Sequence, residues 1–278
     1  MRDLAFPQNI NTPLTPGPGT LQNRRPWPFF SSITQYPAGA SANYNAMTLK
    51  GTKRYSNGLE FLVSYTWSHN LDGGNGLLND NTSSIRDPYN LSLDYGNAAY
   101  DLRRSFVASS IYDLPFGAGR RWMRTGTAAW LLGGWQLGGI LTLQTGHYFT
   151  PTLSIDLTNT GTTNFPNAIA NPNLPSAQRT IQDWFNLSAF ALPQTYIYGN
   201  AGRGIVEGPP LNNMDLTIGR NIYFRERYRL VFRAEMFDFT NTPHFALPNA
   251  TVNSPQEGRI TSTVGNPRQI QLALKLVF

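Results

Sequence analysis

Apolar and polar residues alternate along several segments of the chain. The clearest segment covers residues 59–67, where every second residue is aromatic, Val or Leu and, apart from Leu62, the residues between them are polar. A period of two with aromatic and β-branched residues is typical of a β-strand. Asn57-Gly58 precedes this segment, and the dipeptide favours the type I′ turn of a tight hairpin. The pattern therefore predicts a hairpin whose first, weaker strand covers about residues 44–54.

Five further segments alternate in the same way, at about 102–114, 134–145, 213–223, 228–239 and 269–278. Together they predict an all-β fold, an antiparallel up-and-down meander of about seven strands. The connections after the second, fourth and sixth strands are long, and the others are shorter. Loops above about 12–15 residues are unusual in compact soluble domains, whereas transmembrane barrels alternate short periplasmic turns with long extracellular loops. The spacing predicts a partial transmembrane β-barrel with every long loop on one side.

The two faces of the predicted strands differ in chemistry. Aromatic residues lie near strand ends on the apolar face, where a membrane-interface girdle would sit: Tyr65, Trp67, Tyr112, Trp135, Tyr228 and Phe278. The opposite face carries polar and charged residues that we expect to line a hydrated bore: Arg103, Asp113, Gln136, Asp215, Arg229, Arg233, Glu235 and Lys275. A soluble β-sandwich that acts as a binding or adhesion module also alternates, and it is the alternative.

Composition narrows the class of protein. Charged residues make up only 14% of the chain, against about 25% in ordinary soluble domains, while 40% hydrophobic content argues against disorder. The 25 Gly and 20 Pro argue against a helical bundle. The net charge of +6 comes from scattered arginines rather than a stripe, so we expect no nucleic-acid partner. The apolar stretch 127–143 is too short for a membrane helix, and the first 43 residues, rich in Pro, Asn and Thr, predict a loop.

Candidate chemistry is sparse. The histidines His69, His147 and His244 follow strand ends, and we expect them to be solvated rim residues rather than metal ligands. The same holds for five aspartates of a Gly- and Asn-rich loop, Asp72, Asp80, Asp87, Asp94 and Asp101. Trp184 and Phe185 could stack on a ligand or anchor the longest loop. We expect no catalytic residues, no metal and no cofactor, and so no enzyme.

Several short motifs follow one another along the chain in the same order as in a known protein family. They are Phe61-Leu62-Val63-Ser64-Tyr65-Thr66-Trp67-Ser68, Asp101-Leu102-Arg103-Arg104-Ser105-Phe106-Val107, Leu114-Pro115-Phe116-Gly117, Trp184-Phe185-Asn186, Gly199-Asn200-Ala201-Gly202-Arg203, Asn213-Met214-Asp215, Phe232-Arg233-Ala234-Glu235-Met236-Phe237 and Asn241-Thr242-Pro243-His244-Phe245. With these motifs residues 44–278 resemble the C-terminal barrel part of TonB-dependent outer-membrane receptors, particularly the Oar-like group with its carboxypeptidase-regulatory-like domain.

The resemblance implies an outer-membrane location and gated import of bulky substrates. Receptors of this family have about 22 strands and a plug, whereas the pattern here predicts about seven strands and no plug. We therefore expect a C-terminal fragment that does not transport alone and that meets the TonB system only through the missing part, with residues 1–43 as an extracellular loop. Its other expected partners are outer-membrane lipid and the barrel-assembly machinery. The resemblance makes the closing residues Ile270, Leu272, Leu274, Leu276 and Phe278 an assembly signal.

Overall fold

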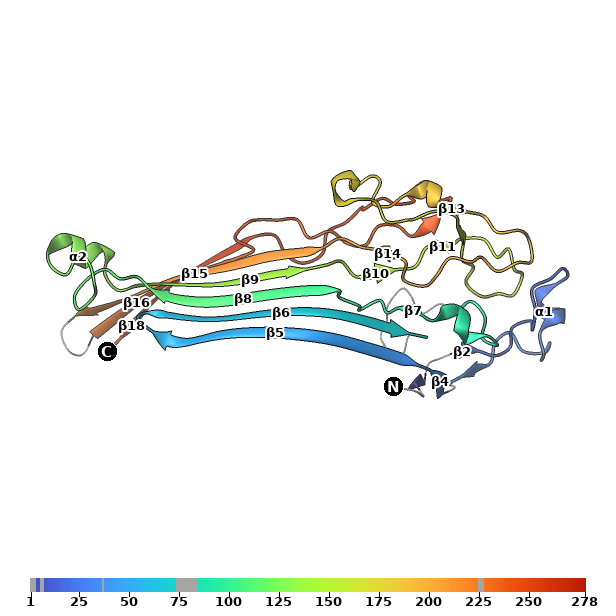
Figure 1. Ribbon diagram of the computed structural model, residues 1–278, viewed down its shortest axis with the longest axis horizontal. Coiled ribbons are helices and arrows are strands. Elements are labelled where there is room, and N and C mark those ends of the chain that lie inside the picture. Colours follow the sequence, from blue (N-terminus) through green and yellow to red (C-terminus); the bar gives the residue numbers. More distant parts are fainter. Residues whose placement is uncertain (1–3, 6–7, 37, 74–84, 225–227) are drawn as a thin grey trace.

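A long antiparallel sheet dominates the computed structural model, which describes residues 4–5, 8–36, 38–73, 85–224 and 228–278 (Figure 1). Seven strands follow one another in chain order across the sheet. They are β5 (Ala42–Ser56), β6 (Leu59–Asp72), β8 (Arg104–Asp113), β9 (Trp135–Gln144), β15 (Leu211–Phe224), β16 (Tyr228–Phe237) and β18 (Gln269–Val277). The two-residue strand β7 (Gly96–Asn97) pairs with the far end of β6. The predicted all-β meander of about seven strands is confirmed.

The strand register sorts the side chains as the alternation predicted. Val63 pairs with Ala108, Ala108 with Leu141, and Leu141 with Met214, so one apolar row crosses four strands. Because neighbouring residues of a strand point to opposite faces, the residues between them form rows on the other face, which hold most of the polar and charged side chains and also Leu62, Ile111 and Ile140. Thr217 pairs with Glu235 in such a row. We call the apolar side the outer face and the polar side the inner face.

The outer face is left uncovered. Its aliphatic and aromatic side chains are mostly half-buried in the central strands and exposed at the edge strand β18, and 72% of Leu272 and 56% of Trp67 are accessible. Among the described residues no second sheet of comparable size stacks on it, because every other sheet has two strands. A β-sandwich needs two sheets packed face to face. The alternation of apolar and polar residues in this chain therefore does not come from a sandwich. No described helix is long and apolar enough to cross a membrane.

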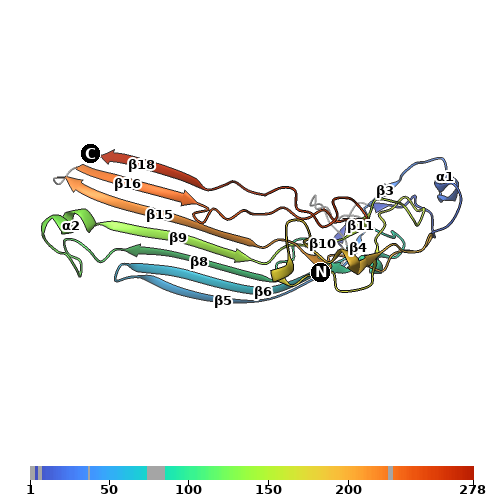
Figure 2. The ribbon, with the colours of Figure 1, turned by 90° about the horizontal axis from the view of Figure 1, so that it is seen from above.

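Turns and loops segregate to opposite ends of the strands, as Figure 2 shows. Asn57 and Gly58 have φ of 54° and 80°, which is the backbone that a type I′ turn requires. The connection after β8 contains a short helix, α2 (Gly126–Leu132), which alternation alone does not reveal. The last residue, Phe278, lies at this short-turn end, as predicted (Figure 1).

The long connections form a compact body at the other end of the strands. We call the described residues of 85–103, 145–210 and 238–268 the loop cap. Its regular elements are short: η1 (Leu91–Asp94), β10 (Tyr148–Phe149), β11 (Thr152–Leu153), β12 (Asn167–Ala168), η2 (Ser176–Gln178), η3 (Leu187–Ala189), β13 (Phe190–Ala191), β14 (Val206–Glu207) and β17 (Thr251–Val252). The hydrophobic core of the molecule lies here, and Phe165, Phe185 and Val206 are almost fully buried in it.

The first 43 residues are more ordered than the predicted loop. They contain β1 (Leu4–Ala5), β2 (Gln8–Asn9), α1 (Leu21–Arg24), β3 (Thr34–Gln35) and β4 (Ala38–Ala40). The strand pairs are only two or three residues long, so no alternating run announces them. The amide of Asn159 in the loop cap donates hydrogen bonds to the carbonyls of Gly17 and Gly19, which fixes this segment against the cap.

Candidate functional site on the inner face

A hollow of about 520 Å³ lies in the inner face of the sheet, across β6, β8, β9, β15 and β16. Gly138 and Gly139 of β9 line its middle, and an added Cβ at Gly138 would meet Thr217 at 3.6 Å. Gly138 lies on the inner face in register with Thr217, so its lack of a side chain keeps the hollow open, whereas Gly139 is in register with Leu216 of the outer face. Small barrels fill their interior with side chains, so an open inner face is typical of a wider wall.

Four of the eight predicted bore residues line this hollow: Gln136, Asp215, Arg233 and Glu235. Arg233 and Glu235 form an ion pair of 2.9 Å with exposed side-chain fractions of 60% and 30%. Asp215 accepts hydrogen bonds from the Asn213 amide and from the backbone N–H of Asp238, so it also fixes the end of β16. With Glu60 the hollow holds three carboxylates and one arginine, and its charge is therefore net acidic.

Asp113 lies outside the hollow, at the short-turn end of β8. It accepts hydrogen bonds from the Tyr55 hydroxyl, from Gln136 at 2.8 Å and from Arg120 at 3.0 Å. The cluster joins β5, β8 and β9 with the turn after β8. Asp113 thus organises the turns, and Gln136 connects this cluster to the hollow.

The remaining predicted basic residues do not meet at the hollow. Arg229 and Lys275 lie on the inner face of β16 and β18, paired in register with Tyr223 and Val231. Arg103 lies at the loop-cap end of β8, where it donates to Asp101 at 2.5 Å, to Asn97 at 2.8 Å and to His69. A continuous line of bore cations is therefore not present among the described residues.

Trp184 and Phe185 anchor the longest loop. Phe185 is 1% exposed and packs edge-on against Phe149 and Phe190. Trp184 is buried as well, and its indole donates to the Glu207 carbonyl at 2.8 Å. Because both rings form the core of the loop cap, neither presents a face on which a ligand could stack. Of the two roles open from the sequence, the structure assigns anchoring.

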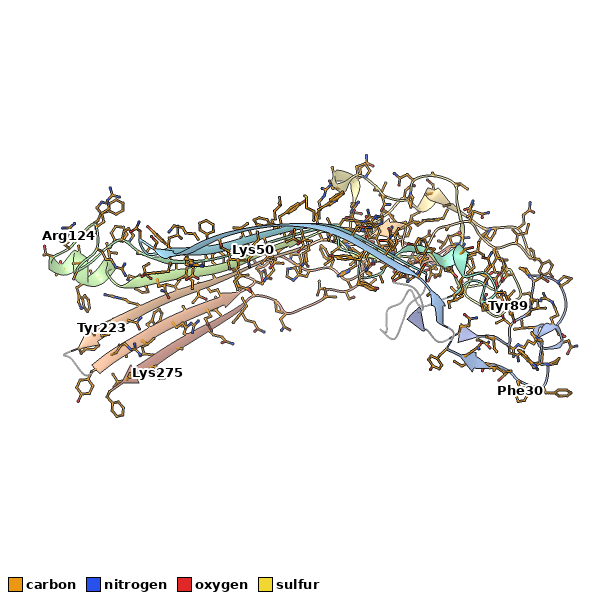
Figure 3. The ribbon with its side chains drawn as sticks, turned by 60° about the horizontal axis from the view of Figure 1, so that its bottom comes forward. Phe30, Lys50, Tyr89, Arg124, Tyr223 and Lys275 are labelled. Carbon is orange, nitrogen blue, oxygen red and sulfur yellow. The ribbon has the colours of Figure 1, made fainter. Side chains whose placement is uncertain are left out.

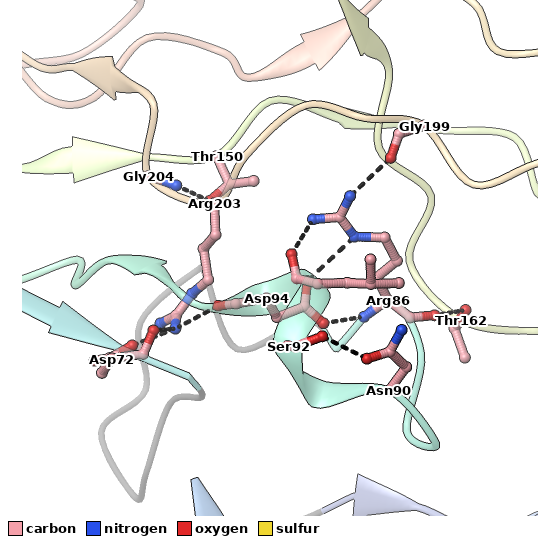
Figure 4. A network of polar contacts seen from close by, with 11 residues as sticks. Asp72, Arg86, Asn90, Ser92, Asp94, Thr150, Thr162, Gly199, Arg203 and Gly204 are labelled. Carbon is pink, nitrogen blue, oxygen red and sulfur yellow. Dashed lines mark hydrogen bonds and ion pairs between the residues drawn. The ribbon is translucent and has the colours of Figure 1, made fainter. Parts of the chain in front are cut away.

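The expectation of solvated loop acids is wrong for three of the five aspartates. Asp72, Asp94 and Asp101 are each 1% exposed, and their partners are Arg203, Arg86 and Arg103. Figure 4 shows the first two pairs. Asp87 accepts the backbone N–H of Tyr89 at 2.9 Å, and Asp80 lies outside the described residues. Arg203 is 131 positions from Asp72 in the sequence, so the local composition of Gly and Asn does not reveal that pair. Arg86 and Arg103 are only 8 and 2 positions from their partners, but the loop composition does not reveal that the pairs are buried.

Burial shifts the pKa values of the Arg86–Asp94 pair. Burial raises the pKa of Asp94 and lowers the pKa of Arg86, although the two are joined by hydrogen bonds from the Arg86 amide at 2.8 Å and Nε at 3.3 Å. Arg86 also donates to the carbonyl of Gly199 at 2.7 Å and lies 4.2 Å from the Phe165 ring centre. Burial likewise raises the pKa of Tyr198 to about 12. Since burying ions is costly, the pairs define how the loops meet more than they add stability.

The three histidines are separate from one another in their contacts. His69 faces Arg103 and Asn97, His147 lies 3.1 Å from the Ala99 carbonyl, and His244 lies 3.1 Å from the Asn212 carbonyl. No three His, Asp or Glu side chains of the described residues are grouped as ligands of one metal ion.

The closing apolar residues share the outer face of β18, which is an edge strand because it pairs only with β16 among the described strands. Their exposed fractions are all above one half, for Ile270, Leu272, Leu274, Leu276 and Phe278. Side chains so exposed on a regular strand are typical of a surface that faces lipid.

Comparison with known proteins agrees with this geometry. The family described as the outer membrane beta barrel domain matches residues 1–271. No curated protein and no solved structure matches the chain. An uncovered apolar face, a polar inner face and segregated loops are what such a domain requires. The chain therefore belongs to the outer membrane beta barrel domain family and is a protein of the bacterial outer membrane.

Proposed function

We propose that the sheet is the C-terminal part of the barrel of a TonB-dependent receptor of the Oar-like group, and that the complete receptor performs gated import of bulky substrates rather than catalysis. The observation that carries the proposal is the open inner face with its charged hollow. In the narrow barrels that side chains fill, no such hollow would remain.

The number of strands supports a wider wall. A small closed barrel needs about eight strands, and bacterial single-chain barrels have even numbers. The described sheet has seven long strands in its path, and β5 and β18 each pair along one side only. An unpaired edge within lipid leaves N–H and C=O groups unsatisfied, at a cost of several kcal/mol for each group. We infer that further strands complete the wall and that this chain alone does not transport.

Thiol labelling of the complete receptor in living cells tests gated transport, and the part formed by this chain contributes no Cys of its own. Thr217→Cys places a thiol in the hollow, and Leu216→Cys places one on the outer face beside it. A membrane-impermeant maleimide added to cells should label the thiol of Thr217→Cys and should not label the thiol of Leu216→Cys. In a TonB-dependent receptor, labelling of Thr217→Cys should fall severalfold when a protonophore or loss of TonB removes the energy supply.

Labelling of Thr217→Cys in the complete receptor that is equal with and without TonB would mean a passive pore and would end the import proposal. Labelling of Leu216→Cys at the same rate as Thr217→Cys would contradict the assignment of the outer and inner faces. That result would not bear on whether import depends on TonB.

We also propose that the outer-face residues of β18 and Phe278 are read by the barrel-assembly machinery. Two observations support this proposal: β18 is an edge strand of the described sheet, and its outer-face side chains are exposed. Phe278→Ala should lower the amount of folded protein in the outer membrane severalfold, whereas Gln271→Ala on the inner face of the same strand should leave it unchanged. Equal amounts of both variants would contradict an assembly signal.

A further inference from the structure

The connection between β8 and β9, residues 114–134, carries exposed apolar side chains although it lies outside the sheet. We call it the α2 turn. Trp122, Met123, Trp130, Leu131 and Leu132 are each exposed to between 44% and 61%, and α2 buries none of its residues. Isolated helices shorter than about 12–15 residues are marginal in water. A seven-residue helix without a core therefore requires another surface to cover it.

Backbone hydrogen bonds nevertheless fix the conformation of the α2 turn. Gly117 donates its N–H to the Trp122 carbonyl at 3.1 Å, and Trp122 donates to the Pro115 carbonyl at 3.0 Å. A Cβ added to Gly133 would lie 2.9 Å from the Cα of Gly117, so the start and end of the turn touch closely. The exposed side chains are thus held in place on a closed frame.

Contacts with the sheet place α2 on the outer face. Arg220 belongs to an outer-face row, in register with Trp135 on one side and Phe232 on the other. Its guanidinium lies 5.6 Å from the Trp130 ring centre and 5.3 Å from the Trp135 ring centre, and it donates to the Trp130 carbonyl. The Trp135 indole in turn donates to the Leu131 carbonyl at 3.0 Å. Figure 3 shows the helix at the short-turn tip of the sheet, near the labelled Arg124.

Basic residues accompany the apolar ones. Arg120 is paired with Asp113 at 3.0 Å, but Arg121 and Arg124 are exposed and form no ion pair with a carboxylate of the described residues. Arg121 lies 5.4 Å from the Trp122 ring centre. Short helices with Trp and Leu on the surface and Arg beside them bind at the interface of membranes that contain anionic lipids.

We propose that the α2 turn binds the surface of the surrounding membrane, with Trp130 and Leu131 in the interface and Arg121 and Arg124 on the headgroups of anionic phospholipids. Short turns of such barrels face the periplasm, so the lipids are those of the periplasmic leaflet. The apolar part is continuous with the outer face through Trp130, Arg220 and Trp135, which fits a single lipid-covered surface. Charge complementarity selects anionic headgroups.

Quenching of tryptophan fluorescence by brominated lipids tests this proposal on the full chain folded in zwitterionic micelles. Brominated phosphatidylglycerol should quench at a lower mole fraction than brominated phosphatidylcholine. Each surface arginine contributes about fivefold to binding of anionic lipid. Arg121→Gln with Arg124→Gln should therefore abolish the preference, and Arg259→Gln with Arg268→Gln, which removes equal charge from the loop cap, should keep it.

Trp130→Ala should remove a large share of the quenched fluorescence, whereas Trp27→Ala, at an exposed tryptophan near the opposite end of the molecule, should not. Circular dichroism confirms that each variant retains its strands. Equal quenching of the parent chain by both lipids would overturn the proposal. So would an undiminished preference in the double arginine variant, or unchanged quenching in Trp130→Ala.

Discussion

The sheet and the loop cap bury their apolar side chains in opposite ways. In the cap, Phe165 and Phe185 are 2% and 1% exposed and pack with their neighbours into a dry core. In the sheet, the aliphatic rows of β18 remain exposed, and Ala234 is the only described hydrophobic residue of the seven strands that counts as buried. The cap is thus built like a soluble domain that carries its own core. The apolar outer face of the sheet instead packs against the lipid of the bilayer.

Ion pairs repeat the contrast. Arg86 and Asp94 in the cap are 3% and 1% exposed, whereas Arg233 and Glu235 in the sheet are 60% and 30% exposed. The second pair is exposed and its attraction is therefore screened by solvent, while the first pair depends on its protein partners. The two regions should therefore respond differently to the same chemical change, which can be measured.

The largest effect is expected from removing one member of the buried pair. Asp94→Leu leaves the Arg86 guanidinium buried without its carboxylate and should destabilise the cap by about 3–5 kcal/mol. Glu235→Leu, the same change in the exposed pair, should cost about 1 kcal/mol or less. Hydrogen exchange of cap and sheet amides measures both. Equal costs would mean that the cap is as hydrated as the inner face.

A charge on the outer face should come next. Leu272→Arg places a cation on the lipid side near the middle of β18 and should cost about 2–4 kcal/mol in folding into vesicles. Gln271→Arg, one residue away on the inner face, provides the matched control and should cost little. Urea titration in vesicles measures the difference. A larger cost for Gln271→Arg would reverse the assignment of the faces.

A smaller effect is expected from Trp184→Phe, which keeps an aromatic ring in the cap core. The change removes the indole N–H that reaches the Glu207 carbonyl and should cost about 1–3 kcal/mol if that carbonyl stays dry. Thermal unfolding followed by near-ultraviolet circular dichroism reports the cap. Trp67→Phe on the exposed outer face is the control and should leave this transition in place.

The smallest effect concerns pH. Burial acts to raise the pKa of Asp156, but hydrogen bonds from the Gly161 N–H, Thr158, Asn164 and the Thr160 N–H outweigh it, so the net pKa lies below the ordinary value. A carboxylate with a lowered pKa contributes its stability above about pH 3.9, and the contribution is lost as pH falls through the lower folded-state value. Exchange of the Gly161 amide should accelerate over that range. Asp156→Asn should remove this dependence while the sheet amides stay unaffected.

The sheet was predictable from the sequence because its signal is local. The Asn57-Gly58 turn and the alternation over residues 59–67 lie within eleven consecutive positions, and β6 begins where they predict. The inner-face hollow was partly predictable too, since Arg233, Glu235, Asp215 and Gln136 were identified from the polar side of the alternation.

The cap was not predictable in this way because its signal is distant. Asp72 and Arg203 are 131 positions apart, and each looks like an ordinary loop residue in its own surroundings. In the sequence Phe185 looks like an ordinary loop aromatic, but in the fold it packs against Phe149 and Phe190, which belong to separate segments of the cap. The helix α2 was also not predicted from the sequence. Its seven residues are too few for a helical period to be distinguished from the strand that follows.

Among the described residues, each long strand pairs only with the long strands before and after it in the chain, apart from the short β7 on β6, and the order of the long strands shows no crossover. Deleting or inserting a whole hairpin would leave the partners of all remaining strands unchanged. The circumference of such a wall is therefore a modular quantity, set by how many hairpins the gene encodes and not by any one of them.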